Sequence, residues 1–263
     1  MTRARRSLKY IVPVLAVVTL ASACQSSDDS SSPDSATTAD QTLTVLAASS
    51  LTGSFTDLAS QFEDAHPGSS VALSFGSSST LATQVIDGAP ADVLATASPG
   101  SMQPVVDEGL TEGRPQLLAE NSVAIAMPPD NPAGLKQLDD LANADVKVAV
   151  CVETAPCGSV ANDLFDLAKI DVTPVTQEVD VKSVLAKVTT GEVDAGVVYV
   201  TDVQAAGDQV AELPVPKQYT VTTDYLVASL KDAAEPDLAS EFTDFVLSPQ
   251  GQQVLADAGF TVS

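Results

Sequence analysis

The spacing of apolar residues after position 42 constrains the fold of this 263-residue chain more than any other feature. Short apolar runs, such as residues 43–47 and 71–75, alternate with stretches in which apolar residues recur every three or four positions. Short apolar runs bounded by turn residues are typical of buried strands, and the longer spacing is typical of amphipathic helices. The alternation predicts an α/β fold with mostly parallel sheets flanked by helices.

The predicted elements form two sets. The first set has strands at 43–47, 71–75 and 93–95 and helices at 55–62, 81–86 and 102–106. The second set has strands at 123–126, 146–150 and 195–200 and helices at 135–141, 159–168 and 181–188. An extended stretch, 219–230, can then lead the chain back, and helices at 238–247 and 250–258 follow it.

Two sets of this kind indicate two lobes joined by two crossings of the chain. We expect the crossings near residues 120 and 220, so that lobe 1 comprises 41–120 and 223–263 and lobe 2 comprises 121–222. Ligands of α/β folds bind in crevices at the ends of strands and between domains. We therefore expect a ligand cleft between the two lobes.

The N-terminal segment, 1–23, has the pattern of a secretory signal. Four basic residues lie within the first nine positions, and an apolar run, 10–21, follows them. This run is too short to cross a bilayer, which takes about 20 apolar residues. Small residues precede Cys24, as they do at the cleavage sites of secretory signals.

Cys24 directly follows the small residues, in an arrangement that resembles the lipobox of bacterial lipoproteins, although Leu20 lies one place further from the Cys than is usual. The resemblance implies an exported protein, anchored to the outer face of the cell membrane by a lipidated Cys24. The alternative is an ordinary cleaved signal with an unrelated Cys. Residues 25–40 are polar and small, and they predict a flexible tether.

The net charge of −23 limits the classes of partner. Such an acidic chain does not suit nucleic acid or an anionic lipid surface, and it does not offer a cluster of basic side chains for an anion. Two cysteines, Cys151 and Cys157, remain besides Cys24. In an oxidising compartment they are expected to form a disulfide, whereas the rival, zinc, needs four ligands and the chain has one His, His66.

Two turns between a predicted strand and a predicted helix are rich in small hydroxyl residues. Residues 47–53 contain Ser49 and Ser50, and residues 75–81 contain three consecutive serines, 77–79. The first N–H groups of a helix lack intrahelical partners, and its dipole favours negative charge there. Two such turns facing each other would form a neutral, donor-rich anion site. The alternative is that these serines cap their helices.

Five strings of the sequence carry a resemblance to a known family. They are LAASSLTGSF, FGSSSTLATQVIDGAPADVLATAS, APCGSVA, VDVKSVLAKVTTGEVDAGVVYVTD and SPQGQQVLADAGF, and they run in order from about residue 43 to 261. They resemble the molybdate-binding proteins of bacterial ABC importers. The resemblance implies a two-lobed periplasmic-binding-protein fold of type II, a monomer without a cofactor, and a membrane permease with its ATPase as partners.

The same resemblance implies five contacts to molybdate or tungstate, all of them neutral hydrogen-bond donors. The hydroxyls of Ser50, Ser78 and Tyr199 and the backbone N–H groups of Cys157 and Val181 correspond to the family's contacts. The family usually has Ala where this chain has Cys157, a difference that is tolerable for a backbone contact. Tyr199 also lies at the end of a predicted strand, where a side chain reaches the cleft.

Other classes of function have weaker support in the sequence. We do not expect an enzyme, because no nucleophile or phosphate-binding motif occurs and His66 lies beside Pro67 at a helix end. Adjacent tyrosines for iron(III) are missing, although carboxylate metal sites and organic solutes stay open. Another oxyanion, such as sulfate, is the main alternative. Because neither serine-rich turn contains Asp or Glu, the sequence favours a fully deprotonated anion.

Overall fold

A computed structural model of the chain describes residues 41–262, and it confirms the predicted α/β class. The predicted signal, Cys24 and the tether lie outside the described residues. The strands are β1 Gln41–Ala48, β2 Ser69–Gly76, β3 Val93–Thr96, β4 Gln116–Met127, β5 Val148–Cys151, β6 Thr176–Glu178, β7 Ala195–Tyr199, β8 Ala211–Leu213 and β9 Thr222–Ser229. None of the helices between residues 41 and 262 combines the length and the apolar character that a membrane crossing requires.

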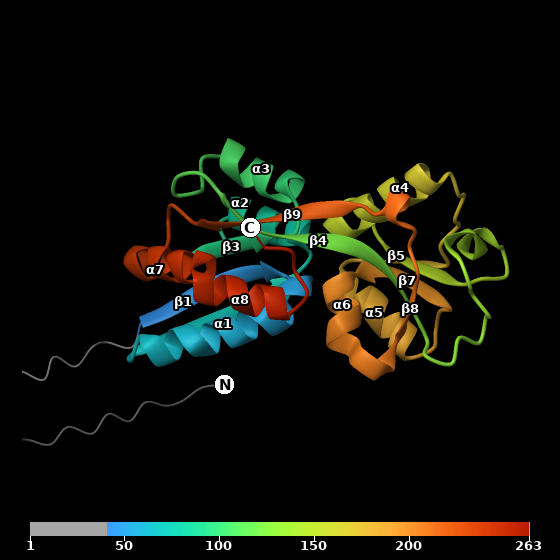
Figure 1. Ribbon diagram of the computed structural model, residues 1–263. Helices are drawn as coiled ribbons and strands as arrows, with labels where there is room; N and C mark the ends of the chain where they lie inside the picture. The colour runs from blue at the N-terminus through green and yellow to red at the C-terminus, as the bar shows by residue number, and fades with distance from the viewer. Residues whose placement is uncertain (1–40, 263) are drawn as a thin grey trace, which may run out of the picture. The chain divides into compact units, whose positions relative to one another are not determined.

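The helices cover the strands on both faces (Figure 1). The α-helices are α1 Thr52–Ala65, α2 Ser78–Ile86, α3 Pro99–Asp107, α4 Pro156–Ala168, α5 Val181–Thr189, α6 Val200–Ala206, α7 Pro236–Leu247 and α8 Pro249–Asp257. Four short 3₁₀ helices, η1 Ser49–Leu51, η2 Leu138–Ala142, η3 Gly207–Gln209 and η4 Lys217–Tyr219, lie between them.

The sheet is more mixed than the sequence predicts. Its strand order is β2-β1-β3-β9-β4-β7-β5-β6, with β8 paired to β4. The pairs β1–β2, β1–β3, β5–β6 and β5–β7 are parallel, whereas every pair that includes β4 or β9 is antiparallel. The antiparallel pairs arise because β4 leaves the first set of elements and β9 returns to it.

Strands β4 and β9 lie side by side and connect the two groups of elements (Figure 1). The first part of β4, residues 116–122, pairs with β9, and its second part, residues 123–126, pairs with β7. One strand thus belongs to both halves of the sheet. Because the two connecting strands are hydrogen-bonded to each other, they form a two-stranded ribbon between the halves.

The apolar residues gather in separate cores on the two sides of this ribbon. One core contains Leu43, Phe55, Phe62 and Phe242, which come from β1, α1 and α7 and are fully buried. A smaller core lies beneath α2 and α3 on the opposite face of the same strands. The buried residues of the third core all lie between Val123 and Leu213. Two groups of elements with their own cores fit the two-lobed periplasmic-binding-protein fold.

The helix expected at 135–141 is not present. The structure has an irregular loop followed by η2, and the N–H of Leu135 donates to the Asn131 side chain. The three buried residues Leu135, Leu138 and Leu141 are spaced by three, which matches the three residues per turn of a 3₁₀ helix rather than an α-helix. The predicted strand at 195–200 also ends one residue early, because α6 begins at Val200.

Candidate functional site

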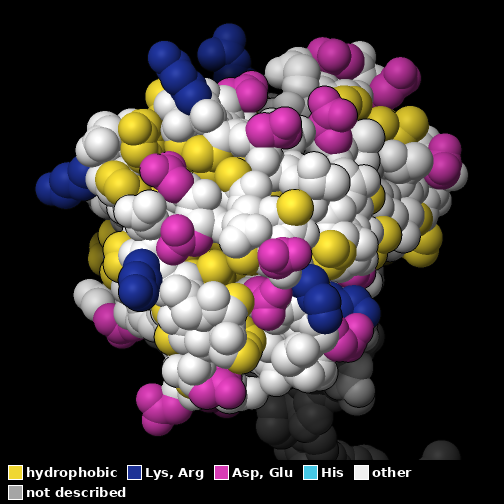
Figure 2. Space-filling view, turned by 90° about the vertical axis from the view of Figure 1, so that its right-hand side faces the viewer, with side chains coloured by type: hydrophobic (Ala, Val, Ile, Leu, Met, Phe, Trp, Pro, Cys, Tyr) yellow, Lys and Arg dark blue, Asp and Glu magenta, His cyan; other side chains and the backbone are white. Residues whose placement is uncertain are grey.

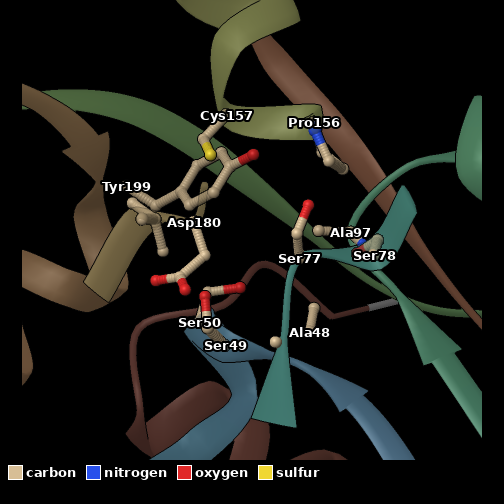
Figure 3. Close-up of a pocket in the computed structure, with 12 residues that line it drawn as sticks. Ala48, Ser49, Ser50, Ser77, Ser78, Ala97, Pro156, Cys157, Asp180 and Tyr199 are labelled. Carbon is tan, nitrogen blue, oxygen red and sulfur yellow. The ribbon is translucent and has the colours of Figure 1, made fainter. Parts of the chain in front are cut away.

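A small cavity lies between the two groups of elements, and all five residues expected to contact a ligand line it. Ser50 and Ser78 come from the first group of elements, and Cys157, Val181 and Tyr199 come from the second (Figure 3). The volume of the cavity is about 10 Å³.

The two serine-rich turns lie together because β1 and β2 are adjacent parallel strands. Ala48, the last residue of β1, pairs with Gly76, the last residue of β2. The carboxyl ends of parallel strands reach the same edge of a sheet, so Ser50 in η1 and Ser78 at the start of α2 lie beside each other at that edge. Ser49 and Ser77 line the cavity as well, and sequence reasoning did not single them out as contacts.

These serines do not serve as helix caps. Ser77 is the N-cap residue of α2 and makes no side-chain capping bond, and the N-cap residue of α1 is Leu51. The Ser78 oxygen instead accepts the backbone N–H of Ala97 at 2.9 Å. That N–H can only donate, so the Ser78 proton remains available to the cavity. The capping alternative is therefore wrong for this pair of turns.

The second side of the cavity is formed by two helix starts. Cys157 lies in the first turn of α4, after Pro156, and Val181 is the first residue of α5. The first N–H groups of a helix have no partner within the helix, and they carry partial positive charge. Both helices therefore bring unpaired donors to the cavity without a cationic side chain.

A disulfide between Cys151 and Cys157 joins the end of β5 to the first turn of α4. The turn is tight: a Cβ added to Gly158 would lie 2.0 Å from the Val152 carbonyl oxygen. Only glycine therefore fits at position 158, because any side chain would collide with the backbone of the loop. The glycine and the disulfide together fix the position of the Cys157 N–H.

Tyr199 is the last residue of β7, and its side chain is only 1% exposed. Its hydroxyl has no hydrogen-bond partner among residues 41–262. Burial raises the pKa of Tyr199 well above its usual value, so the hydroxyl keeps its proton and is a donor. Figure 3 shows this hydroxyl and that of Ser77 pointing into the same space. A buried hydroxyl without a partner costs about 1–3 kcal/mol, which a bound acceptor would recover.

Asp180 lines the cavity and was not foreseen from the sequence. It is the N-cap residue of α5, and its carboxylate accepts the N–H of Ser183 at 2.9 Å. In Figure 3 the carboxylate points toward the side of the cavity formed by Ser49 and Ser50. The sequence contained one usable signal, since Asp before an amphipathic run is typical of a helix N-cap. The cavity is thus rich in donors but contains one acidic group.

An ion pair connects α5, which begins at Val181, to α6, which begins directly after Tyr199. Lys182 Nζ lies 2.9 Å from Asp202 Oδ1, and the other Asp202 oxygen accepts the Tyr199 backbone N–H at 3.0 Å. Asp202 is fully buried, whereas the Lys182 side chain is 33% exposed. Burial raises the pKa of Asp202, and the charge of Lys182 opposes this effect. The Lys182 charge is therefore neutralised by its partner.

Among the acidic side chains of residues 41–262, Asp180 is the one that lines the cavity. Figure 2 shows Asp and Glu side chains spread over one face of the molecule, with Lys and Arg side chains among them. Within the part of the chain that the structure describes, no three His, Cys, Asp or Glu side chains are grouped to hold a metal ion.

The sequence and fold are similar to those of known binding proteins. The family model of the bacterial extracellular solute-binding protein matches residues 43–261. The molybdate-binding protein ModA of Mycobacterium tuberculosis is 37% identical over 238 residues, which cover 90% of this chain and 91% of that protein. A putative ABC transporter substrate-binding lipoprotein, YvgL, of Bacillus subtilis is 27% identical over 96% of this chain and 98% of its own length.

Among solved structures, the periplasmic molybdate-binding protein of Azotobacter vinelandii has a TM-score of 0.74 and 20% identity, covering 84% of this chain and 99% of that one. This likeness supports the fold, and the family match spans nearly all of the described residues. Proteins of this family bind solutes and are not enzymes. The chain belongs to the family of bacterial extracellular solute-binding proteins.

Proposed function

We propose that this chain captures molybdate or tungstate outside the cytoplasm and delivers it to an ABC importer. The observation that carries the proposal is the buried Tyr199 hydroxyl, which has no partner among the described residues and faces a cavity of about 10 Å³. An unpartnered buried hydroxyl costs about 1–3 kcal/mol, so a ligand that accepts its proton is stabilised by the same amount. The names of the similar proteins support molybdate as the ligand.

The proposed site provides five donors. The hydroxyls of Ser50, Ser78 and Tyr199 and the N–H groups of Cys157 and Val181 would each donate to an anion oxygen. Helix starts and hydroxyls suit an oxyanion because they offer positive partial charge without a countercharge that needs its own partner. Molybdate and sulfate have the same shape and charge, so the fixed spacing of these donors would select the anion with the longer bonds.

The proposed delivery requires a membrane partner and a moving cleft. We propose that lobe 1 comprises 41–120 and 223–263, that lobe 2 comprises 121–222, and that the β4–β9 ribbon is the hinge. A lipidated Cys24 would hold the monomer at the outer face of the membrane. Residues 25–40, with a reach of roughly 20–24 Å, would let the lobes dock on a permease coupled to an ATPase.

Thermal unfolding with different anions tests the proposed function. Purified residues 41–263 would be heated with molybdate, tungstate, sulfate or phosphate. A ligand at 1,000 times its Kd adds about 4.1 kcal/mol, which raises the Tm of a domain of this size by roughly 8–16 °C. Large shifts with molybdate and tungstate alone support the proposal. A shift with sulfate alone overturns the specificity, and no shift with any of the four overturns oxyanion binding.

Asp180→Asn is expected to increase the affinity for molybdate about tenfold. Asn is as good an N-cap residue as Asp, so α5 should keep its start. Removing a negative charge beside a doubly charged anion relieves more than about 1.4 kcal/mol of repulsion, which is a factor of ten. Asp163→Asn, which changes the same charge on an exposed part of α4, is the control. Titration calorimetry gives the affinities. If Asp180→Asn binds the anion more weakly than the wild type does, Asp180 accepts a proton from the ligand.

Replacing both Cys151 and Cys157 with Ser is expected to weaken molybdate binding about tenfold. The disulfide holds the first turn of α4 in place, so its loss would require the Cys157 N–H to be ordered during binding. Reduction of the wild-type chain provides a second way to break the same bond. If affinity stays unchanged in both cases, the disulfide has no role in presenting this N–H.

A further inference from the structure

A buried chain of polar side chains connects Ser50 to the ribbon between the lobes. The Ser50 oxygen lies 2.8 Å from the Tyr225 hydroxyl, which in turn accepts an N–H of Asn121 at 3.3 Å. The Asn121 amide also donates to Thr201 Oγ1 at 2.9 Å. All four side chains are buried. Asn121, Thr201 and Tyr225 do not line the cavity, so a role in direct contact with a ligand does not explain them.

The orientation of the Asn121 amide sets the direction of these hydrogen bonds. Its oxygen accepts the backbone N–H of Ser122 at 2.9 Å. A backbone N–H can only donate, so the Asn121 oxygen must face Ser122 and the NH₂ group must face Tyr225 and Thr201. The Tyr225 oxygen therefore receives a hydrogen bond from Asn121 and cannot return one to it.

The proton of Tyr225 then has one possible acceptor among the side chains bonded to its oxygen, which is Ser50. Tyr225 is fully buried, and burial raises the pKa of Tyr225, so the proton stays on the hydroxyl. If Ser50 donated instead, the Tyr225 proton would be left without a partner, because the neighbouring Tyr199 hydroxyl forms no hydrogen bond within the described residues and Tyr225 is fully buried. The arrangement with all bonds formed has Asn121 donating to Tyr225 and Tyr225 donating to Ser50.

This direction leaves the Ser50 proton free for the cavity. Ser78 is in the same state, because its oxygen accepts the Ala97 N–H. We infer that Asn121 and Tyr225 are positioning residues for specificity, since they hold Ser50 as an obligatory donor and so exclude anions that carry a proton at this contact. The inference rests on the proposed function, because it concerns an oxyanion in the same cavity.

Phosphate and sulfate form the matched pair of ligands for a test. They are similar in size, but phosphate carries a proton at neutral pH and sulfate does not. In Tyr225→Phe the Ser50 hydroxyl loses its donor and can rotate to accept a proton from phosphate. The ratio of phosphate affinity to sulfate affinity is expected to rise about tenfold, the worth of one hydrogen bond to a charged group. Affinities too weak for direct titration would be measured by competition with molybdate.

Two further variants separate the direction of the bonds from a general loss of structure. Asn121→Asp replaces the donor with a carboxylate that accepts the Tyr225 proton, so Ser50 must donate to Tyr225 and accept from the ligand. The phosphate-to-sulfate ratio should rise here too. Thr201→Val removes a hydroxyl from the same chain but leaves the Tyr225 proton directed at Ser50, so the ratio should not change. Thermal unfolding without ligand checks that each variant is folded.

The inference is overturned if the ratio is unchanged in both Tyr225→Phe and Asn121→Asp, or if Thr201→Val raises it equally. A looser pocket would shift phosphate and sulfate together, and the ratio would stay constant. Binding of molybdate by the wild-type chain decides the proposed function separately. A chain that binds molybdate but whose variants keep the wild-type ratio would therefore retain its function and lose only this inference.

Discussion

Tyr199→Phe is expected to bind molybdate about 10 to 100 times more weakly than the wild-type chain, while its Tm without ligand stays the same or rises. The hydroxyl of Tyr199 is buried and has no partner in the described part of the chain. Removing it deletes a donor that the unliganded protein cannot use, so the folded state should not lose stability. In the complex the same deletion loses a hydrogen bond to a charged acceptor, worth about 1.5–3 kcal/mol.

This variant is informative because its affinity for molybdate should fall while its Tm without ligand should not. Most substitutions of a buried residue lower stability, so weaker binding alone could reflect damage to the fold. Tyr219→Phe is the matched control, because it removes a phenolic hydroxyl from η4, which does not line the cavity. Calorimetric titration and thermal unfolding would be measured for both. If Tyr199→Phe is less stable than the wild type but binds molybdate equally well, the hydroxyl has a structural partner and does not contact the ligand.

Lys182→Met is expected to lower the free energy of unfolding by about 3 kcal/mol at pH 7, and thus to lower the Tm by roughly 6–12 °C. The substitution leaves the carboxylate of Asp202 buried and without its cation, 2.9 Å from where the ammonium stood. Breaking a fully buried pair costs about 3–5 kcal/mol. The low end applies because Lys182 is one-third exposed and water screens the pair.

The loss of stability in Lys182→Met should become smaller as the pH falls, because Asp202 then becomes protonated. Burial raises the pKa of this carboxyl in the folded protein above its value of 3.8 in the unfolded chain, and the loss of Lys182 raises it further. As the pH falls, the folded variant therefore takes up a proton on Asp202 at a higher pH than the unfolded chain does. Between neutral pH and about 4, the variant should regain stability as Asp202 becomes neutral.

Lys187→Met provides the control on the same helix. Lys187 pairs with Glu192 at 2.7 Å, and Glu192 is 55% exposed. Surface pairs of this kind contribute little, so its Tm should remain close to that of the wild type at every pH. If Lys187→Met lowers the Tm as much as Lys182→Met does, the pairing with Asp202 is not the cause of the destabilisation.

The strands and most helices could be predicted because their apolar spacing determines what is buried. Strand β1 and helix α5 illustrate this, since the apolar residues at 43–47 and the spacing of Val181, Val184 and Val188 coincide with buried positions. The five expected contacts also converge on one cavity, because turns at the carboxyl ends of neighbouring strands meet. Whether they bind an anion stays a prediction.

The elements and residues that sequence reasoning missed have in common that their role depends on distant partners. Strand β6 reads Thr-Gln-Glu, with no apolar side chain, and it forms because β5 provides hydrogen bonds. Asn121 and Tyr225 lie far apart in the sequence and meet only because β4 and β9 pair. Helix α6 is short, and it begins where the Asp202 side chain accepts the Tyr199 N–H. No local pattern contains these contacts.

The division of the apolar cores also determines which parts of the chain must be present before each core can form. The core that contains Val123 and Leu213 uses one continuous stretch, so it can form once that stretch is present. The core around Phe62 needs Phe242, whose ring packs 5.2 Å from it. Strands β1 to β3 therefore come first in the chain, but the core to which they belong is completed last, when α7 is present. Until residues 236–260 are present, the apolar faces of these N-terminal strands have no complete core to pack into.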